Sequence, residues 1–159
     1  MQNEKISIID YGLGNIESLK NAIKKIGYIP DLYSTNSIIN SNIAIIPGVG
    51  SFNYAMKLII SKNIDKEINK FVSKDSNFLI GICLGMQLLF ESSTEIDLST
   101  GLGLMKGKVD KLTFEKSKKL PNVGWKETFI LEKKNFEYLN KYNKKNFYYV
   151  HSFKCIPKN

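Results

Sequence analysis

A cysteine flanked by glycines at a strand-to-helix junction constrains the fold of this chain more than any other feature. Asn77–Ile82 is a short apolar run of the strand type, and Leu84–Glu91 follows it with the pattern of a helix. Between them, Gly81 and Gly85 flank Cys83 with the spacing of a nucleophile elbow. Only small neighbours let a strand and a helix pass each other this closely. The junction therefore predicts a strand, a sharp turn and a helix, with the sulfur of Cys83 above the end of a sheet.

The first half of the chain repeats this alternation of strand-like and helix-like segments. Short apolar runs predict strands at Lys5–Asp10, Pro30–Tyr33 and Asn42–Ile46. Apolar residues at helical spacing predict one helix between an N-cap at Asn15 and a C-terminal Gly27, and another from about Tyr54 to Val72. Strands separated by helices of this length favour right-handed βαβ crossovers. We therefore expect an α/β fold with a mostly parallel sheet and helices on both of its faces.

The pattern changes from Gly107 onward, where strand-like runs are joined by polar turns. These runs are Lys108–Phe114, Val123–Trp125, Phe129–Leu131 and Phe147–Phe153. We interpret them as antiparallel additions to one edge of the sheet. Because no linker and no internal repeat interrupts residues 1–159, we predict a single domain.

The net charge of +8, carried entirely by lysine, raises the question of nucleic-acid binding. The sequence has no RRM, helix-turn-helix or zinc-ligand pattern, so we interpret the lysines as a solvated surface. We expect no membrane partner either, because no apolar run approaches the roughly 20 residues of a membrane span. The N-terminus lacks the order of a signal peptide, and Cys83 and Cys155 lie too far apart to suggest a disulfide framework. We therefore expect a cytoplasmic protein.

Cys83 is the strongest candidate for a nucleophile. The partial positive charge at a helix N-terminus favours a thiolate there. The backbone N–H of Leu84 would face the position at which an oxyanion develops. The alternative is a small buried hydrophobic side chain between a strand and a helix, as many free cysteines are. The paired glycines favour the catalytic interpretation.

Pro47–Gly50 (PGVG) is a second glycine-rich turn after a buried strand. Such a turn lets backbone N–H groups approach a ligand, and Gly50 is placed to donate a second hydrogen bond to an oxyanion. Taken alone, the run is equally consistent with a plain strand-to-helix turn.

His151 is the only histidine, and a Cys–His pair is the usual way to activate a thiol. The residues alone therefore offer a Cys83–His151 dyad. In the run Phe147–Phe153, however, strand alternation puts Tyr149, His151 and Phe153 on one face. A lone histidine in such an aromatic strand is more often a packed, hydrogen-bonded structural residue. Both interpretations stay open at this point.

Five runs occur in an order that resembles the class I glutamine amidotransferases of the triad type. They are DYGLGN at 10–15, PGVG at 47–50, GICLGMQ at 81–87, PNVGW at 121–125 and YYVHSF at 148–153. The GICLGMQ run marks the class in general. The DYGLGN, PNVGW and YYVHSF runs resemble more narrowly the glutaminase subunits of imidazole glycerol phosphate synthase, an enzyme of histidine biosynthesis. The resemblance spans the whole chain and implies a flavodoxin-like fold.

The resemblance also implies roles residue by residue. Cys83 would attack the side-chain amide carbonyl of glutamine, release ammonia and form a glutamyl thioester that water hydrolyses. Gly50 and Leu84 would supply the oxyanion N–H groups. The implied substrate-binding set is Gly50, Gln87, Glu95, Ser152 and Phe153, and the implied partner interface is Asn15, Trp125 and Tyr148. For Trp125, the only tryptophan, packing in a core or at an edge is an equally good interpretation. No metal and no organic cofactor is implied.

The partner implied by the resemblance is a (β/α)₈-barrel cyclase, in a heterodimer that passes ammonia from one subunit to the other. The family's catalytic base lies in a His-x-Glu run, which residues 1–159 lack. His151 aligns with an earlier histidine of the family. We therefore expect a C-terminally truncated member, lacking the family's C-terminal segment and leaving an exposed sheet edge. Lys126 stands where the family usually has asparagine.

Three alternatives to this function stay open. A paralogue would donate ammonia to a synthase that aminates surface sugars. A catalytically silent subunit would bind glutamine, or only its partner, because the base is absent. A Cys–His hydrolase would use Cys83 and His151, and the implied glutamine-binding residues would then have no purpose.

Overall fold

The computed structural model describes residues 4–34, 39–113, 120–130 and 137–158. The chain divides into two compact units, of which the first comprises Met1–Asp110 with Cys155–Asn159 and the second Lys111–Lys154. The strand–helix alternation lies in the first unit, and the β-ribbon of the later sequence lies in the second. That residues 1–159 form a single domain stays a prediction.

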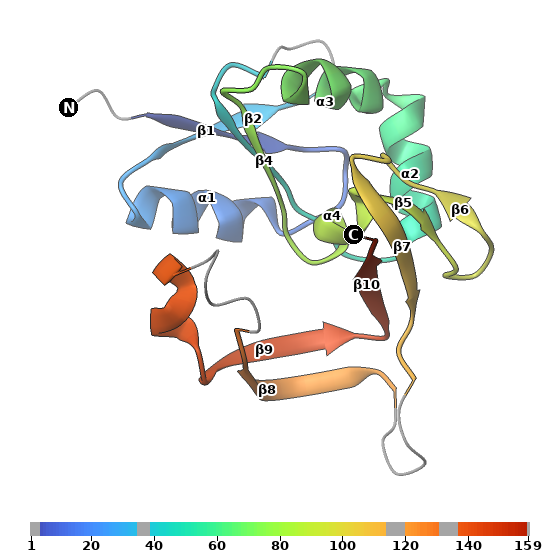
Figure 1. Cartoon of the computed structure of the whole chain (residues 1–159). Helices are drawn as coiled ribbons and strands as arrows, with labels where there is room; N and C mark the ends of the chain where they lie inside the picture. Colours follow the sequence, from blue (N-terminus) through green and yellow to red (C-terminus); the bar gives the residue numbers. More distant parts are fainter. Residues whose placement is uncertain (1–3, 35–38, 114–119, 131–136, 159) are drawn as a thin grey trace. The chain divides into compact units, whose positions relative to one another are not determined.

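The first unit contains a parallel sheet of four strands in the order β2-β1-β3-β4 (Figure 1). These strands are β1 (Lys5–Ile9), β2 (Ile29–Tyr33), β3 (Ile43–Ile46) and β4 (Phe78–Gly81). Every pairing among them is parallel, with Ile8 opposite both Leu32 and Ile45. Pro30 lies in β2, an edge strand, where its missing N–H is tolerated. The four predicted strands and the mostly parallel sheet are confirmed, with bounds that differ by one residue or two.

Helices cover both faces of this sheet, as predicted (Figure 1). Helix α1 (Ile16–Lys25) packs its buried Ile23 against Ile6 and Ile8 of β1 and Ile45 of β3. Side chains alternate along a strand, so the neighbouring residues of β1 and β3 point to the other face. That face is covered by α2 (Phe52–Ser61) and α3 (Ile64–Val72). Their fully buried side chains are Phe52, Ala55, Ile59, Ile64 and Ile68.

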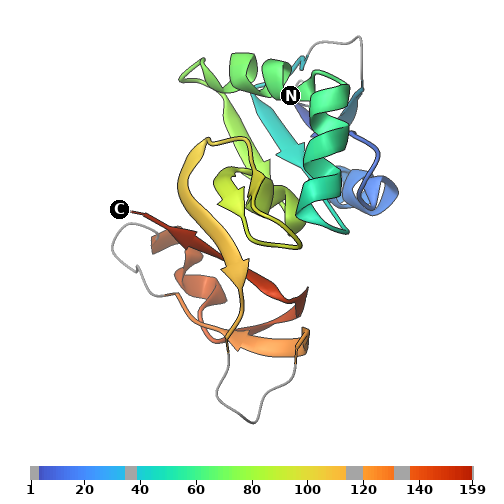
Figure 2. The same ribbon diagram turned by 90° about the vertical axis from the view of Figure 1, so that its right-hand side faces the viewer.

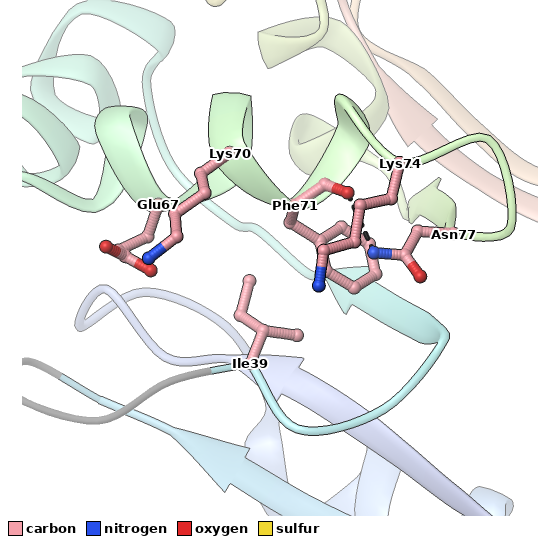
Figure 3. A pocket seen from close by; sticks show the side chains of 6 residues that line it. All are labelled: Ile39, Glu67, Lys70, Phe71, Lys74 and Asn77. Carbon is pink, nitrogen blue, oxygen red and sulfur yellow. Dashed lines mark hydrogen bonds between the residues drawn. The ribbon is translucent and has the colours of Figure 1, made fainter.

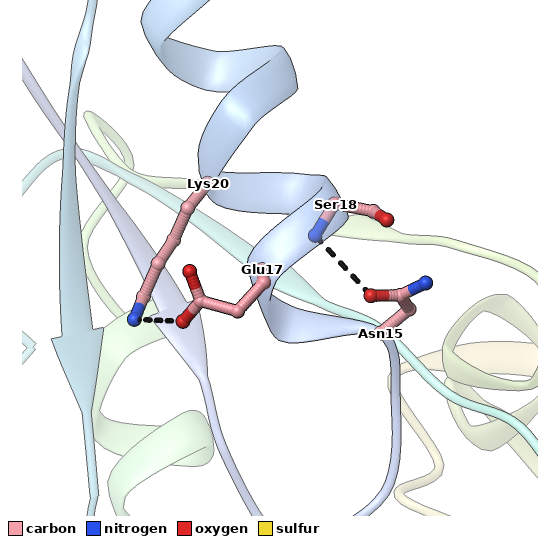
Figure 4. Close-up of polar contacts among 4 residues, drawn as sticks. All are labelled: Asn15, Glu17, Ser18 and Lys20. Carbon is pink, nitrogen blue, oxygen red and sulfur yellow. Dashed lines mark hydrogen bonds and ion pairs between the residues drawn. The ribbon is translucent and has the colours of Figure 1, made fainter.

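The ends of α1 follow the predicted capping pattern. The Asn15 side-chain oxygen accepts a hydrogen bond from the Ser18 N–H at 3.2 Å, and Glu17 pairs with Lys20 at 2.6 Å (Figure 4). At the other end, Gly27 follows the C-cap residue Ile26 and has a φ of 89°, which favours glycine. The N-cap and the helix-terminating glycine are therefore both confirmed.

Two predicted helices were wrong in extent. The segment from Tyr54 to Val72 is two helices, because Asn63 between them adopts a left-handed φ of 55°. Asparagine tolerates this conformation better than most residues. The helix predicted over Leu84–Glu91 ends early: α4 covers only Leu84–Leu88, and Phe90–Ser93 forms strand β5.

Strand β5 belongs to a second sheet with the order β10-β7-β5-β6. The other strands are β6 (Ser99–Thr100), β7 (Met105–Lys111) and β10 (Phe153–Pro157). Strand β6 is antiparallel to β5, whereas β7 is parallel to it. The prediction that the strands after Gly107 add antiparallel to one edge of the parallel sheet was therefore wrong, because they pair in two further sheets and β7 pairs in parallel. The predicted strand Lys108–Phe114 begins three residues earlier and ends at Lys111, and Phe114 lies outside the described residues.

The second unit is built on an antiparallel ribbon of β8 (Asn122–Thr128) and β9 (Lys145–His151), with Trp125 opposite Tyr148. A 3-10 helix, η1 (Glu137–Tyr142), precedes β9. Six residues of this unit line an apolar hollow of about 360 Å³: Thr128, Ile130, Leu139, Tyr142, Phe147 and Tyr149. The strand predicted at Phe129–Leu131 was wrong for Phe129 and Ile130, and Leu131 lies outside the described residues. Figure 2 shows both strands of the ribbon from another side.

Each helix in the described parts of the chain is too short or too polar to cross a membrane.

Candidate active site

The chain makes a strained turn at Cys83, between β4 and α4. The backbone of Cys83 has φ 54° and ψ −117°, which L-residues rarely adopt, and its side chain is exposed. Before the turn, the Ile82 N–H donates to the Ile46 carbonyl at 3.0 Å, which fixes the end of β4 to β3. After it, the Met86 N–H donates to the Cys83 carbonyl at 3.1 Å and starts the helix. Cys83 is thus presented outward by a strained backbone, and the interpretation as a buried hydrophobic residue was wrong.

Steric crowding requires glycine at both Gly81 and Gly85. A Cβ on Gly85 would overlap the carbonyl oxygen of Ile46, and a Cβ on Gly81 would overlap the Cα of Met86. Both obstacles are backbone atoms that side-chain rotation does not move. The reason predicted for the paired glycines is therefore confirmed.

The Pro47–Gly50 turn lies against the elbow. A Cβ on Gly48 would come within 2.9 Å of both the Gly85 nitrogen and the Leu84 Cβ. As the first residue of α4, Leu84 has an N–H without an intrahelical partner. Gly50 is exposed and has a φ of 96°, with open space around its Cα. The structure therefore brings together the two loops from which the oxyanion N–H groups were predicted, while that role for Gly50 and Leu84 stays a prediction.

Glu95 approaches the same loop from a distant part of the sequence. Its Oε2 accepts a hydrogen bond from the Phe52 N–H at 2.7 Å, at the first residue of α2. The side chain of Ser51, the N-cap residue, makes no capping hydrogen bond, so the Glu95 carboxylate takes that place. Gln87 is half-buried on α4, and its N–H donates to the Cys83 carbonyl at 3.3 Å. Gln87 and Glu95 thus flank the elbow and the turn.

Both ring nitrogens of His151 are engaged within the second unit. Nε2 lies 2.9 Å from the side-chain amide nitrogen of Asn122, and Nδ1 lies 2.8 Å from the Phe153 carbonyl oxygen. An amide nitrogen donates and a carbonyl accepts, so Nε2 accepts and Nδ1 carries the proton. The lone pair that a general base needs is already used. This geometry favours the structural interpretation of His151.

The family model described as "Glutamine amidotransferase class-I" matches residues 7–159. The chain belongs to this family. Among curated relatives, it is 43% identical to "Imidazole glycerol phosphate synthase subunit HisH 2" of Vibrio vulnificus, over 93% of this chain and 70% of that protein. It is 37% identical to the HisH subunit of Aquifex aeolicus, over 94% of this chain and 72% of that protein. Within the class-I amidotransferases, the chain therefore groups with the HisH subunits.

A relative from Arabidopsis thaliana, "Imidazole glycerol phosphate synthase hisHF, chloroplastic", is 35% identical over 96% of this chain. That match covers only 25% of the Arabidopsis protein. Among solved structures, a "Crystal structure of glutamine amidotransferase" superposes with a TM-score of 0.68 at 18% identity, over 97% of this chain and 74% of that one. At that identity the superposition shows the fold alone, and it confirms the predicted class I amidotransferase fold.

The other predicted residues of this amidotransferase lie on exposed surfaces or in the second unit. Trp125 is 70% exposed and Tyr148 57% exposed, with their rings edge to face at a centroid distance of 5.7 Å. Packing of Trp125 in a core was therefore wrong. Asn15 is exposed, and its side-chain oxygen caps α1. Ser152 and Phe153 belong to the second unit. Substrate binding by Ser152 and Phe153, and partner contact by the other three, stay predictions.

Tyr11 is the residue near Cys83 to which the sequence interpretation assigned no role. Its side chain is fully buried, and its hydroxyl donates to the Pro47 carbonyl at 2.8 Å. It lies in the DYGLGN run, in which Asn15 was given a role and Tyr11 was not. The signal in the sequence was its position at the start of a glycine-rich turn, directly after an apolar strand.

A small hollow under α3 has a different composition from the candidate site. It measures about 50 Å³, and its walls are Ile39, Glu67, Lys70, Phe71, Lys74 and Asn77 (Figure 3). The Asn77 side chain donates to the Phe71 carbonyl at 2.8 Å. None of the predicted site residues lines it, and its volume is close to that of one or two water molecules.

Proposed function

We propose that this chain is the glutaminase subunit of an imidazole glycerol phosphate synthase, which hydrolyses glutamine to glutamate and ammonia. The observation that carries the proposal is the strained, outward-facing Cys83 at the N-terminus of α4, beside the Pro47–Gly50 turn. The grouping with HisH subunits supports the same activity and its place in histidine biosynthesis. Cytoplasmic localisation stays a prediction.

The proposed chemistry begins at the sulfur of Cys83. The thiolate attacks the side-chain amide carbonyl of glutamine, and the C–N bond breaks as the nitrogen takes up a proton and leaves as ammonia. Water then hydrolyses the glutamyl thioester, which frees glutamate and the thiol. Leu84 and Gly50 would donate N–H groups to the oxyanion of each tetrahedral intermediate. Loss of one such donor typically costs about 10²–10³ in kcat.

Glu95 and Gln87 are proposed to hold the amino-acid end of glutamine. A carboxylate pairs well with the substrate's α-ammonium group, because charge-assisted hydrogen bonds are the strong ones. Glu95 keeps one oxygen, Oε1, beyond its hydrogen bond to Phe52. Ser152 and Phe153 are proposed to contribute backbone contacts to the substrate.

The proton transfers need a general base, and we propose that His151 is not that base. Both of its ring nitrogens have partners in the second unit. The His-x-Glu run of the family has no counterpart in the 159 residues. General acid–base help typically contributes about 10²–10⁴ in rate, so turnover by these residues alone is expected to be slow.

The proposed partner is a (β/α)₈-barrel cyclase subunit that receives the ammonia in a heterodimer. Trp125 and Tyr148 form an exposed aromatic pair on the β-ribbon, and large aromatic side chains of this kind are typical anchors of interfaces. Asn15, in the first unit, is also proposed to contact the partner. The partner would use the ammonia to convert a ribonucleotide into imidazole glycerol phosphate and an aminoimidazole carboxamide ribotide.

The test combines glutamine turnover with a binding assay on the same samples. The chain is mixed with its cognate cyclase, and glutamate release is compared for the wild type, Cys83→Ala and His151→Ala. Glutamine binding is measured as protection of Cys83 from alkylation by iodoacetamide, with asparagine as the matched control. We expect glutamine alone to protect, and turnover to require Cys83 but to fall less than about tenfold in His151→Ala. Protection without turnover would identify a catalytically silent subunit. The absence of both protection and turnover would contradict the proposal.

A further inference from the structure

We propose that Tyr11 is a positioning residue, whose hydroxyl holds the Pro47–Gly50 turn in place against the nucleophile elbow. The inference rests on the proposed function, because it assigns the turn a part in glutamine hydrolysis. Tyr11 has no exposed surface, and its Oη donates to the Pro47 carbonyl at 2.8 Å. A buried phenol without a partner is costly, so this hydrogen bond is strongly maintained. It fixes the direction of the peptide group that enters the turn.

Packing around Gly48 connects the phenol to the elbow. A Cβ at this position would lie 2.5 Å from the Tyr11 Oη and 2.9 Å from the Gly85 nitrogen and the Leu84 Cβ. The Tyr11 hydroxyl and the start of α4 therefore both lie close to Gly48, at the position where a side chain would begin. A shift of the phenol is transmitted to the turn, because nothing compressible lies between them.

A hydrogen bond also fixes the backbone of Tyr11. The Lys62 Nζ donates to the backbone carbonyl of Tyr11 at 2.9 Å, from the C-terminal end of α2. Gly14, three residues further on, approaches the turn as well, since a Cβ there would lie 3.1 Å from the Pro47 Cβ and Cγ. The loop after β1 thus contacts the turn at two points, with the hydroxyl of Tyr11 as its polar contact.

The charge environment keeps the hydroxyl a donor. Burial, and secondarily the negative charge of Cys83, raise the pKa of Tyr11 well above its usual range. The phenol therefore stays protonated when Cys83 is a thiolate, and its hydrogen bond to Pro47 persists through the reaction.

The test compares Tyr11→Phe with Tyr33→Phe. Both tyrosines are buried in the first unit, at 0% and 4% exposure, and both variants keep the ring while losing one hydroxyl. Tyr33 lies on β2, the edge strand farthest from β4 in the sheet order. Two readouts are taken with the cyclase present: amide hydrogen exchange of the fragment 47–52, and kcat and KM for glutamine.

We expect Tyr11→Phe to speed exchange in fragment 47–52 by about tenfold and to lower kcat by about tenfold, with KM within twofold. Tyr33→Phe should change neither. Unchanged exchange in Tyr11→Phe would overturn the proposal, whatever the activity. Faster exchange with an unchanged kcat would overturn the part of the turn in the reaction. If the wild type shows no turnover, the proposed function fails on its own, and the exchange rates still decide whether Tyr11 positions the turn.

Discussion

The elbow at Cys83 and the β8–β9 ribbon present their exposed side chains in opposite ways. At the elbow, the exposed Cys83 is presented by a backbone that tolerates little change: a Cβ on Gly81 or Gly85 would overlap backbone atoms, and Cys83 has a φ of 54°. On the ribbon, ordinary strand alternation exposes a broader apolar face that includes Trp125 and Tyr148. The first arrangement suits chemistry at a single atom. The second arrangement suits binding of a protein partner over an extended apolar surface.

The largest expected effect tests the elbow as a chemical device. Cys83→Ala should lower glutamine turnover by at least about three orders of magnitude, because no other described residue presents a thiol there. Cys83→Gly should be equally inactive but more stable than Cys83→Ala, by about 1 kcal/mol, because glycine relieves the strained backbone. Urea unfolding of the two variants measures the difference. Equal stabilities would show that the turn at Cys83 stores no strain.

A second substitution tests the lack of space at the elbow. Gly85→Ala should destabilise the protein by about 3 kcal/mol, because its Cβ would overlap the Ile46 carbonyl oxygen. Gly27→Ala is the comparison variant: Gly27 has a φ of 89°, but a Cβ there would meet nothing within 4 Å, so this variant tests the backbone conformation without a steric overlap. The control should cost only about 1 kcal/mol, the cost of the backbone conformation. If chemical unfolding showed that both variants lose the same free energy of unfolding, the steric explanation for Gly85 would be wrong.

The same contrast explains how much the sequence could predict. The elbow was predictable because its cause is local: two glycines, a strand and a helix within ten residues. The break at Asn63 was not, because the apolar stripe continues through Ile60, Ile64 and Ile68 as if one helix ran on. Phe90 and Glu91 were predicted as the end of the helix that begins at Leu84, but Phe90–Ser93 forms a strand that pairs with β6 and β7. Pairing partners far along the chain leave no local signal.

The candidate site divides in the same way. Cys83 and the turn at Gly50 followed from motif and spacing, whereas Gln87 and Glu95 entered only through the family resemblance. The hydrogen bond from Phe52 to Glu95 joins residues 43 positions apart and has no sequence pattern of its own. The tautomer of His151 likewise depends on Asn122, a cross-strand neighbour that no spacing rule identifies.

A third substitution tests the ribbon as a binding surface. Trp125→Ala should weaken binding of the cyclase by about 2 kcal/mol, roughly 30-fold in Kd, because it removes a large aromatic anchor. The stability of the free chain should change by less than about 0.5 kcal/mol, since the side chain is exposed. Phe129→Ala, an exposed aromatic outside β8, is the control. Calorimetric titration with the cyclase gives both values, and equal losses in the two variants would contradict a specific role for Trp125.

The smallest expected effect separates two roles of Glu95: it caps the first N–H of α2, and its charge is proposed to face the substrate's ammonium group. Glu95→Ala should destabilise the protein by about 1 kcal/mol, because α2 loses the acceptor at its first N–H. Glu95→Gln keeps an acceptor oxygen and should lose only about half as much. Both variants should raise KM for glutamine similarly, because both remove the charge that would face the substrate's ammonium group. Thermal unfolding and steady-state kinetics are measured on the same preparations. If Glu95→Gln restored KM as well as stability, capping rather than charge would explain the residue, and the ammonium would need another partner.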